Sequence, residues 1–358
     1  MSMMDSVKKA VIKIWAEAFD DSPAYREMYF NHIFRPEDTV TLCDESGATV
    51  SSLLLQRYDI DFHGASLPMG YIAGAATLRK ARNHGYMTAL VAKAIRAARD
   101  RGDMLVSLIP ANRHLYLFYN RLGFSTIFYT DRRHYVAGAA FRFTGNFTFK
   151  EIDLPLTDDL ISAFERLESQ RHGAVRHTSD QFEGIMRDNA MDCGKAYCLT
   201  DSGSGEIAAI AFTATHGHRI LIKDILSNTP NAEKAMLSHI SAVNSRTPMT
   251  FPTIPSPGRP IQPLGMGRIV NVYDALSQVA QVSRHLKGAI RINDPLLPEN
   301  CHTFIINDGT VNIDDTQLKR YDLDISITVL TSLLFSAPRI GEIFGMATHR
   351  PFLSLMLD

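Results

Sequence analysis

In the first third of the chain, a strand-like run of apolar residues is followed by a segment with apolar residues at helical spacing. This order occurs twice. Residues 71–77 form an apolar run typical of a buried strand, and residues 87–98 place apolar side chains at helical spacing. Gly102 predicts the end of that helix, because glycine favours the position just after a helix. A second strand is predicted at 104–109 and a second helix at 113–122. The predicted order is therefore strand, turn, helix, strand, helix.

The remaining residues divide into two further blocks. Residues 141–250 repeat a similar order of strands and helices, but no basic turn lies between strand and helix. The proline-rich segment 251–260 predicts a stiff connector. Beyond it, a short strand is predicted at 267–272, a helix at 273–286, and the strands of a small sheet at 288–293, 303–307 and 309–314. The expected domains are residues 1–138, 139–257 and 258–358.

Composition and charge argue against several classes of protein. The chain has 358 residues, 45% hydrophobic and 21% charged, with a formal net charge of −1. Such a charge gives no attraction to nucleic acid or to an anionic membrane. No apolar run approaches the ~18 residues of a membrane span, and the polar start of the chain does not resemble a signal peptide. Four scattered cysteines indicate free thiols, so we expect a cytoplasmic globular protein.

A basic turn joins the 71–77 strand to the helix that follows it. The turn, at residues 79–87, reads Arg-Lys-Ala-Arg-Asn-His-Gly-Tyr-Met. The first N–H groups of a helix and the positive end of its dipole attract anions. Arg82 adds a fixed cation, and Gly85 lets the backbone approach a ligand closely. The pattern favours a phosphate-binding loop, although basic residues also precede many helices that bind nothing.

Tyr119 lies near the end of the 113–122 helix, and two interpretations are open. It can be an ordinary packing aromatic, like the neighbouring Tyr116 and Phe118. Alternatively, its phenol, with a pKa of ~10, can donate a proton to a thiolate leaving group, whose conjugate acid has a pKa of ~8.5. The residue type alone does not decide between them.

Two other polar pairs suggest weaker candidate sites. His216 and His218, one residue apart, can share a metal ion on a strand, but the sequence offers no evident third ligand, so no metal site is expected. Asp20 and Asp21 either serve a helix end or line a cleft that binds an amine.

The basic turn and the tyrosine together resemble the GNAT superfamily of acyl-CoA-dependent N-acetyltransferases. The superfamily's phosphate motif has Arg or Gln first, Gly fourth and a small residue sixth. Arg82 and Gly85 fit this motif, whereas Met87 departs from the small last residue. The superfamily's Tyr-x-x-x-Gly-Phe element is present from Tyr119 to Phe124.

Over its whole length the chain looks like the "enhanced intracellular survival" type of acetyltransferase, and residues 267–276 are similar to that family's entry into its third domain. The resemblance implies an α/β (α+β) fold with two tandem GNAT-like mixed sheets, flanking helices and a C-terminal domain like sterol carrier protein. The first domain would bind acetyl-CoA, the second would lack the cofactor loop, and the C-terminal tail would complete the active site. A symmetric homo-oligomer, such as a hexamer, is also implied.

The resemblance assigns acetyl-CoA, as co-substrate, to the first domain. The backbone of Ala75, Ala76 and Thr77 would pair with its pantetheine arm. Its pyrophosphate would be held by Arg82, Asn83, His84, Gly85, Tyr86 and Met87.

The resemblance also implies catalytic and acceptor-binding roles. Tyr119 would protonate the CoA thiolate. A carboxylate of Asp358, either the terminal one or the side chain, would act as general base, directly or through water. The amine pocket would include Phe19, Asp21 and Phe30.

Two functions from different classes follow from this reading. The first is an N-acetyltransferase that moves an acetyl group from acetyl-CoA to a primary amine, by direct attack in a ternary complex. Aminoglycosides, polyamines and lysine side chains are all compatible acceptors. The second is a non-catalytic protein that binds acyl-CoA or lipid or serves as a scaffold, because the third domain resembles a lipid carrier and Met87 departs from the loop motif.

Overall fold

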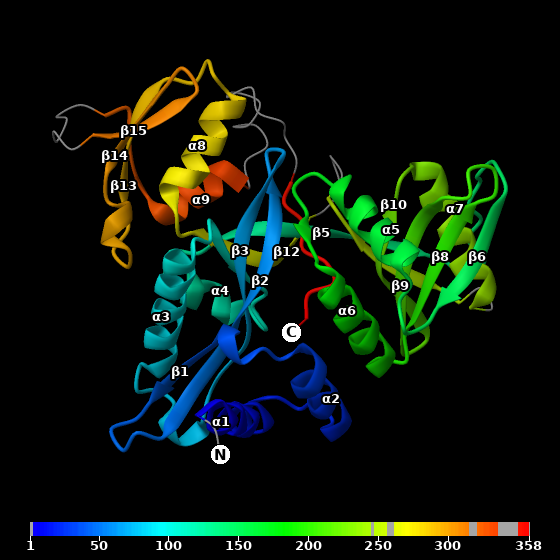
Figure 1. The fold of residues 1–358 in the computed structure, drawn as a ribbon, viewed down its shortest axis with the longest axis horizontal. Coiled ribbons are helices and arrows are strands. Elements are labelled where there is room, and N and C mark those ends of the chain that lie inside the picture. The colour runs from blue at the N-terminus through cyan, green and yellow to red at the C-terminus, as the bar shows by residue number, and fades with distance from the viewer. Residues whose placement is uncertain (1–2, 245–246, 256–260, 315–320, 336–349, 358) are drawn as a thin grey trace.

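The computed structural model describes residues 3–244, 247–255, 261–314, 321–335 and 350–357. It contains a long mixed sheet that runs through most of the chain and a separate four-stranded sheet near the C-terminus (Figure 1). Among these residues, no helix is both long enough and apolar enough to cross a membrane.

The first part of the chain follows the predicted order closely. Its strands are β1 (Thr39–Cys43), β2 (Thr49–Phe62), β3 (Ala65–Thr77), β4 (Leu105–Leu108) and β5 (Ser125–Tyr135). Its helices are α1 (Met3–Ala18), α2 (Pro23–Met28), α3 (Tyr86–Arg101) and α4 (Arg113–Asn120). The apolar face of α3, from Leu90 to Ala98, is buried against the sheet, as the helical spacing predicts. Gly102 ends α3 in the left-handed conformation.

The second part continues the same sheet. Its strands are β6 (Phe147–Ile152), β7 (Val175–Arg176), β8 (Lys195–Asp201), β9 (Ile207–His216), β10 (Arg219–Ser227) and β11 (Met249–Thr253). Its helices are α5 (Asp158–Ser169), α6 (Ser179–Met191) and α7 (Pro230–Val243). The strand order of the long sheet is β1-β2-β3-β4-β12-β5-β11-β10-β9-β8-β6, with β7 paired to β2. The two expected mixed sheets are therefore joined edge to edge, through β5 and β11, into one.

Strand β12 (Gln262–Ile269) differs from the sequence prediction, which began the third domain at residue 258. It lies between β4 and β5 and is antiparallel to both, so it completes the sheet of the first part. Two glycines make this insertion possible, since their positions have no room for a side chain. A Cβ on Gly267 would lie 2.3 Å from Ile127 Cδ1, and one on Gly265 would lie 2.9 Å from Leu353 Cδ1.

The C-terminal part forms a small α+β lobe, at the upper left of Figure 1. Its sheet has the order β15-β14-β13-β16. The elements are α8 (Val272–Val282), β13 (Gly288–Asn293), β14 (Thr303–Asn307), β15 (Thr310–Asp314), β16 (Leu323–Ser326) and α9 (Ile327–Phe335). Helix α9 packs back on the first part, where the rings of Phe335 and Phe62 lie 4.7 Å apart.

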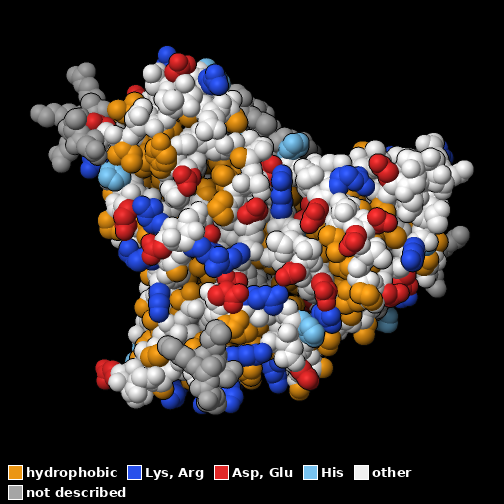
Figure 2. All heavy atoms as spheres, viewed as in Figure 1, with side chains coloured by type: hydrophobic (Ala, Val, Ile, Leu, Met, Phe, Trp, Pro, Cys, Tyr) orange, Lys and Arg blue, Asp and Glu red, His pale blue; other side chains and the backbone are white. Residues whose placement is uncertain are grey.

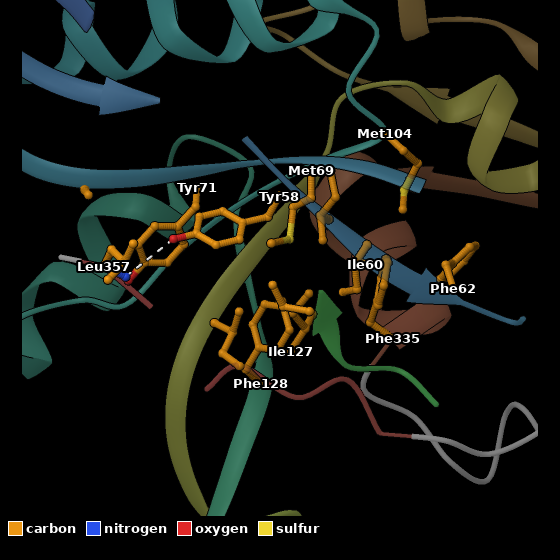
Figure 3. Packing of buried hydrophobic residues seen from close by; sticks show 14 of the residues in the cluster. Tyr58, Ile60, Phe62, Met69, Tyr71, Met104, Ile127, Phe128, Phe335 and Leu357 are labelled. Carbon is orange, nitrogen blue, oxygen red and sulfur yellow. Dashed lines mark hydrogen bonds between the residues drawn. The ribbon is translucent and has the colours of Figure 1, made fainter. Parts of the chain in front are cut away.

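The last described residues, 350–357, run between the first and second parts and end near the middle of the molecule (Figure 1). Phe352 exchanges backbone hydrogen bonds with Gly173 and Val175, and Leu357 is buried. Figure 3 shows Leu357 beside Tyr58 and Tyr71 in the central apolar cluster. The apolar tail therefore packs inside the protein, as its composition predicts. Charged side chains of both signs lie along the seam between the first and second parts on the face shown in Figure 2.

Candidate active site

The basic turn connects β3 to α3 and leads directly into the first helical turn. Asn83 and Gly85 both have positive φ, +66° and +79°, which is costly for most residues and easy for glycine. Gly85 is the N-cap of α3 and has no side chain to cap the first N–H groups. A Cβ built on Gly85 meets no atom within 4 Å, so the space in front of the helix is open. This geometry suits an anion at the helix N-terminus.

The predicted phosphate-loop residues lie together at this turn. The Arg82 guanidinium makes one hydrogen bond to the backbone, in which Nε donates to Thr77 O at 3.2 Å. His84 Nδ1 lies 2.7 Å from Arg82 O. Met87, which departs from the motif, is half-buried and packs on the cluster that includes Leu90 and Tyr119. The larger side chain is thus accommodated beneath the helix.

Strands β3 and β4 separate beside the loop. They are paired only from Met69–Tyr71 to Leu105–Ser107, although β3 continues to Thr77. Among the described strands, the part of β3 that holds Ala75, Ala76 and Thr77 therefore has a neighbour only on its β2 side. An unpaired strand edge offers N–H and C=O groups to an extended ligand.

Gly74 fixes the shape of this separated edge. Its φ is +56°, and a Cβ there would lie 2.2 Å from Trp15. The Trp15 ring covers this bend and donates through Nε1 to Asp21 Oδ2 at 2.7 Å. The sequence offered no signal for this contact beyond the apolar stripe of α1.

Tyr119 lies in the last turn of α4, next to the cluster that backs α3. Its side chain is buried, and its ring lies 5.0 Å from Phe118 and 5.6 Å from Phe124. Burial raises the pKa of Tyr119 to about 12. The phenol therefore keeps its proton at neutral pH, which a general acid requires.

Arg268 of β12 contacts the turn that follows α4, the helix that carries Tyr119. This contact was not predicted from the sequence. Arg268 Nε donates to Leu122 O at 2.9 Å, and its guanidinium pairs with Asp294 in the C-terminal lobe. Both side chains of the pair are fully buried. Gly123 must be glycine here, because its φ is +90° and a Cβ would lie 2.7 Å from Arg268 Nε.

The tail, residues 350–357, contacts the first part of the chain through Leu357. Leu357 O accepts hydrogen bonds from Gln56 Nε2 at 2.8 Å and from Tyr29 Oη at 3.3 Å. Leu357 N donates to Tyr58 Oη at 3.4 Å, the dashed line in Figure 3. Asp358, the predicted general base, lies outside the residues that the structure describes.

A cavity of about 720 Å³ lies between the first part, the second part and the tail. Asp20 and Asp21 line it from the first part, Leu355 and Met356 from the tail, and the second part contributes Asp188, Asp192 and Lys223. Lys223 Nζ lies 2.7 Å from Asp192 Oδ2 and 3.4 Å from Asp188 Oδ2. Burial raises the pKa of Asp188, while Lys223 opposes that shift.

The cavity includes Asp21 but not the two phenylalanines predicted beside it. Phe19 and Phe30 pack around Trp15, with ring centroids 4.9 and 5.5 Å away. Asp188 of α6 and Asp192, which follows that helix, were not predicted from the sequence, because a helical pattern gives no sign of what lies opposite the helix.

Comparisons with known proteins identify the first part. Residues 2–127 match the family described as acetyltransferase (GNAT) domain. A curated protein of Streptomyces avermitilis, named as an uncharacterized N-acetyltransferase, is 26% identical over 203 residues, which cover 51% of this chain and 47% of that protein. The chain thus aligns with about half the length of this relative.

Solved structures match nearly the whole chain in fold. A probable N-acyltransferase from Enterococcus faecalis V583 superposes with a TM-score of 0.78 at 17% identity, covering 99% of this chain and 97% of that chain. Eis1 from Mycobacterium abscessus gives a TM-score of 0.72 at 14% identity, covering 97% and 92%. These matches confirm the Eis-like architecture. The loop, the separated strand edge and Tyr119 all lie within residues 2–127, the segment that matches the GNAT acetyltransferase domain family.

Proposed function

We propose that this protein is an N-acetyltransferase that moves an acetyl group from acetyl-CoA to a primary amine. The observation that carries the proposal is the placing of three parts within one GNAT domain: the open loop at the start of α3, the unpaired edge of β3, and the buried phenol of Tyr119. Each part suits a different portion of an acyl-CoA and its chemistry.

The residues present fit an acyl-CoA donor. The free N–H groups at the start of α3, with Arg82 beside them, suit the pyrophosphate. The edge of β3 around Ala75 and Ala76 suits the amides of the pantetheine arm, which would bind as an added strand. The bend at Gly74 then lies beside the end of that arm.

The transfer needs three proton movements. An alkylammonium, with a pKa near ~10.4, must lose a proton before its nitrogen attacks the thioester carbonyl. As the C–S bond breaks, the departing thiolate takes a proton from Tyr119 Oη. The nitrogen loses its second proton as the amide forms, and a proton from solvent restores the phenol. We assign the base to a carboxylate of Asp358, because Leu357, the residue before it, is bonded to Gln56 and Tyr29 in the first part.

The acceptor is proposed to occupy the 720 Å³ cavity, whose aspartates favour a cationic amine. Aminoglycosides, polyamines and lysine side chains remain the candidate acceptors. The protein is proposed to act as a homo-oligomer in the cytoplasm, with a hexamer as the expected form.

Thiol release from acetyl-CoA, measured with a panel of these amines, tests the proposal. We expect release well above the rate without amine for at least one member, together with binding of acetyl-CoA. Absence of both binding and release would instead favour the non-catalytic alternative. Binding without release would show that the panel misses the acceptor.

A further inference from the structure

Lys223 is the one cationic side chain among the described residues that line the acceptor cavity, which also holds four aspartates. It lies in β10 at a β-bulge, since Ile222 pairs with Thr213 and Asp224 pairs with Phe212, which leaves Lys223 without a partner residue in β9. Such bulges re-aim side chains. Here the bulge brings a lysine to the wall of the cavity.

Lys223 pairs with Asp188 of α6 and with Asp192, which follows that helix, although its sequence neighbour Asp224 is also acidic. Asp224 is fully buried and already occupied, because both of its oxygens accept from Arg171 at 2.7 and 2.8 Å. The Lys223 ammonium instead contacts Asp188 and Asp192, which also line the cavity, and its side chain is only 19% exposed. Tyr25 Oη also donates to Asp188, at 3.3 Å.

This pairing changes the charge that an acceptor would meet. Two of the four aspartates share the Lys223 ammonium, whereas Asp20 and Asp21 have no ion-pair partner within the described ranges. Because interactions between charges a few ångströms apart are strong in a partly buried site, an ammonium already in place weakens the attraction for a second one.

We propose that Lys223 is a specificity-determining residue that acts as an internal counter-cation and makes the cavity select acceptors with one ammonium over polycations. This inference rests on the proposed function, in that the cavity is taken as the acceptor site. Asp20 and Asp21 are left to attract the single ammonium. A polyamine must displace Lys223 from Asp188 and Asp192 to gain the remaining contacts.

The test is a binding titration of the full chain without acetyl-CoA, so that it does not depend on turnover. Spermidine is the polycationic probe and hexylamine is the probe with one ammonium. Lys223→Met is compared with Lys223→Arg, which keeps the charge. Lys195→Met is the matched control, because Lys195 pairs with Glu151 on the exposed surface of β8 and its loss changes the net charge equally.

We expect Lys223→Met to tighten spermidine binding by about tenfold or more and to change hexylamine binding by less than about twofold. Lys223→Arg and Lys195→Met should keep the wild-type ratio of the two affinities. If Lys223→Met does not fold, Lys223→Gln is titrated in its place. An unchanged ratio, or no spermidine binding by the uncharged variant, overturns the inference.

The two proposals fail separately. If the protein neither binds acetyl-CoA nor releases thiol but the binding ratio shifts as expected, the acetyl-transfer function is wrong and the role of Lys223 in charge selection holds. If thiol is released but the ratio does not shift, the transferase proposal stands and the Lys223 inference is overturned.

Discussion

At the scale of single residues, backbone conformation and burial explain the candidate chemistry better than residue type does. Gly85 is left-handed and faces open space, so its lack of a side chain leaves room for a ligand. Tyr119 is buried among apolar neighbours, and its raised pKa keeps it a proton donor. The motifs predicted both positions, but the open space at Gly85 and the raised pKa of Tyr119 depend on the fold around them.

Comparing Gly85→Ala with Gly47→Ala distinguishes a loss of ligand binding from the effect of backbone strain. Gly47, in the turn between β1 and β2, has φ +81° against +79° for Gly85, and a Cβ meets nothing within 4 Å at either position. Each change should therefore cost about 1 kcal/mol of stability. We expect Gly85→Ala to weaken acetyl-CoA binding, measured by calorimetry, at least about tenfold, while Gly47→Ala leaves it unchanged. Equal affinities in the two variants would argue against the loop assignment.

Local sequence signals predicted the loop and the tyrosine, because both depend on short spacings. The cavity proposed to hold the acceptor could not be predicted in the same way. Asp188, Asp192 and Lys223 come from the second part and line the same cavity as Asp21 only after the chain has folded. Phe19 and Phe30, which the resemblance assigned to the amine pocket, pack on Trp15 and do not line this cavity.

At the scale of elements, the tail and β12 join segments that are far apart in the sequence. A short strand was predicted at 267–272, which overlaps the end of β12 (Gln262–Ile269). Its place between β4 and β5 was not predicted, because strand order depends on pairing and not on local pattern. The burial of the tail is consistent with its apolar composition. Its hydrogen bonds to Gln56 and Tyr29 carry no signal in the sequence.

Removing residues 357–358 should abolish turnover and leave acetyl-CoA binding within about twofold of wild type, because the loop and β3 edge lie elsewhere. Asp358→Ala is the matched variant, which removes only the side-chain carboxylate. If Asp358→Ala loses activity, the side chain is the base; if it retains the wild-type kcat, the side chain is not. Full activity of the truncated protein would refute a base on residue 358.

At the scale of the whole molecule, one buried ion pair ties the C-terminal lobe to the helix that carries Tyr119. Arg268 donates to Leu122 O, at the end of α4, and pairs with Asp294 of the lobe. Asp294 also accepts from Asn300 and from the backbone of Leu296 and Leu297. The lobe thus helps to fix the helix of the proposed acid, even though Tyr119 lies in another part of the chain.

Arg268→Met should destabilise the protein by about 3–5 kcal/mol, because Asp294 would remain buried without its cation. Thermal unfolding measures the loss. The exposed pair of Arg96 and Glu299 also joins the first part to the lobe, so Arg96→Met is the control and should cost less than about 1 kcal/mol. Similar unfolding temperatures for the two variants would contradict the structural role given to the buried pair.

The most direct test of the account is the single-turnover rate of acetyl transfer in wild type and Tyr119→Phe, with an acceptor that turns over, between pH 7 and 10. Because burial holds the pKa of Tyr119 at about 12, the phenol stays protonated across this range, and the wild-type rate should not fall as pH rises. Tyr119→Phe should lower the rate by about 10²–10⁴-fold, with acetyl-CoA affinity unchanged. An equal rate in the two proteins would contradict the assignment of Tyr119 as the acid.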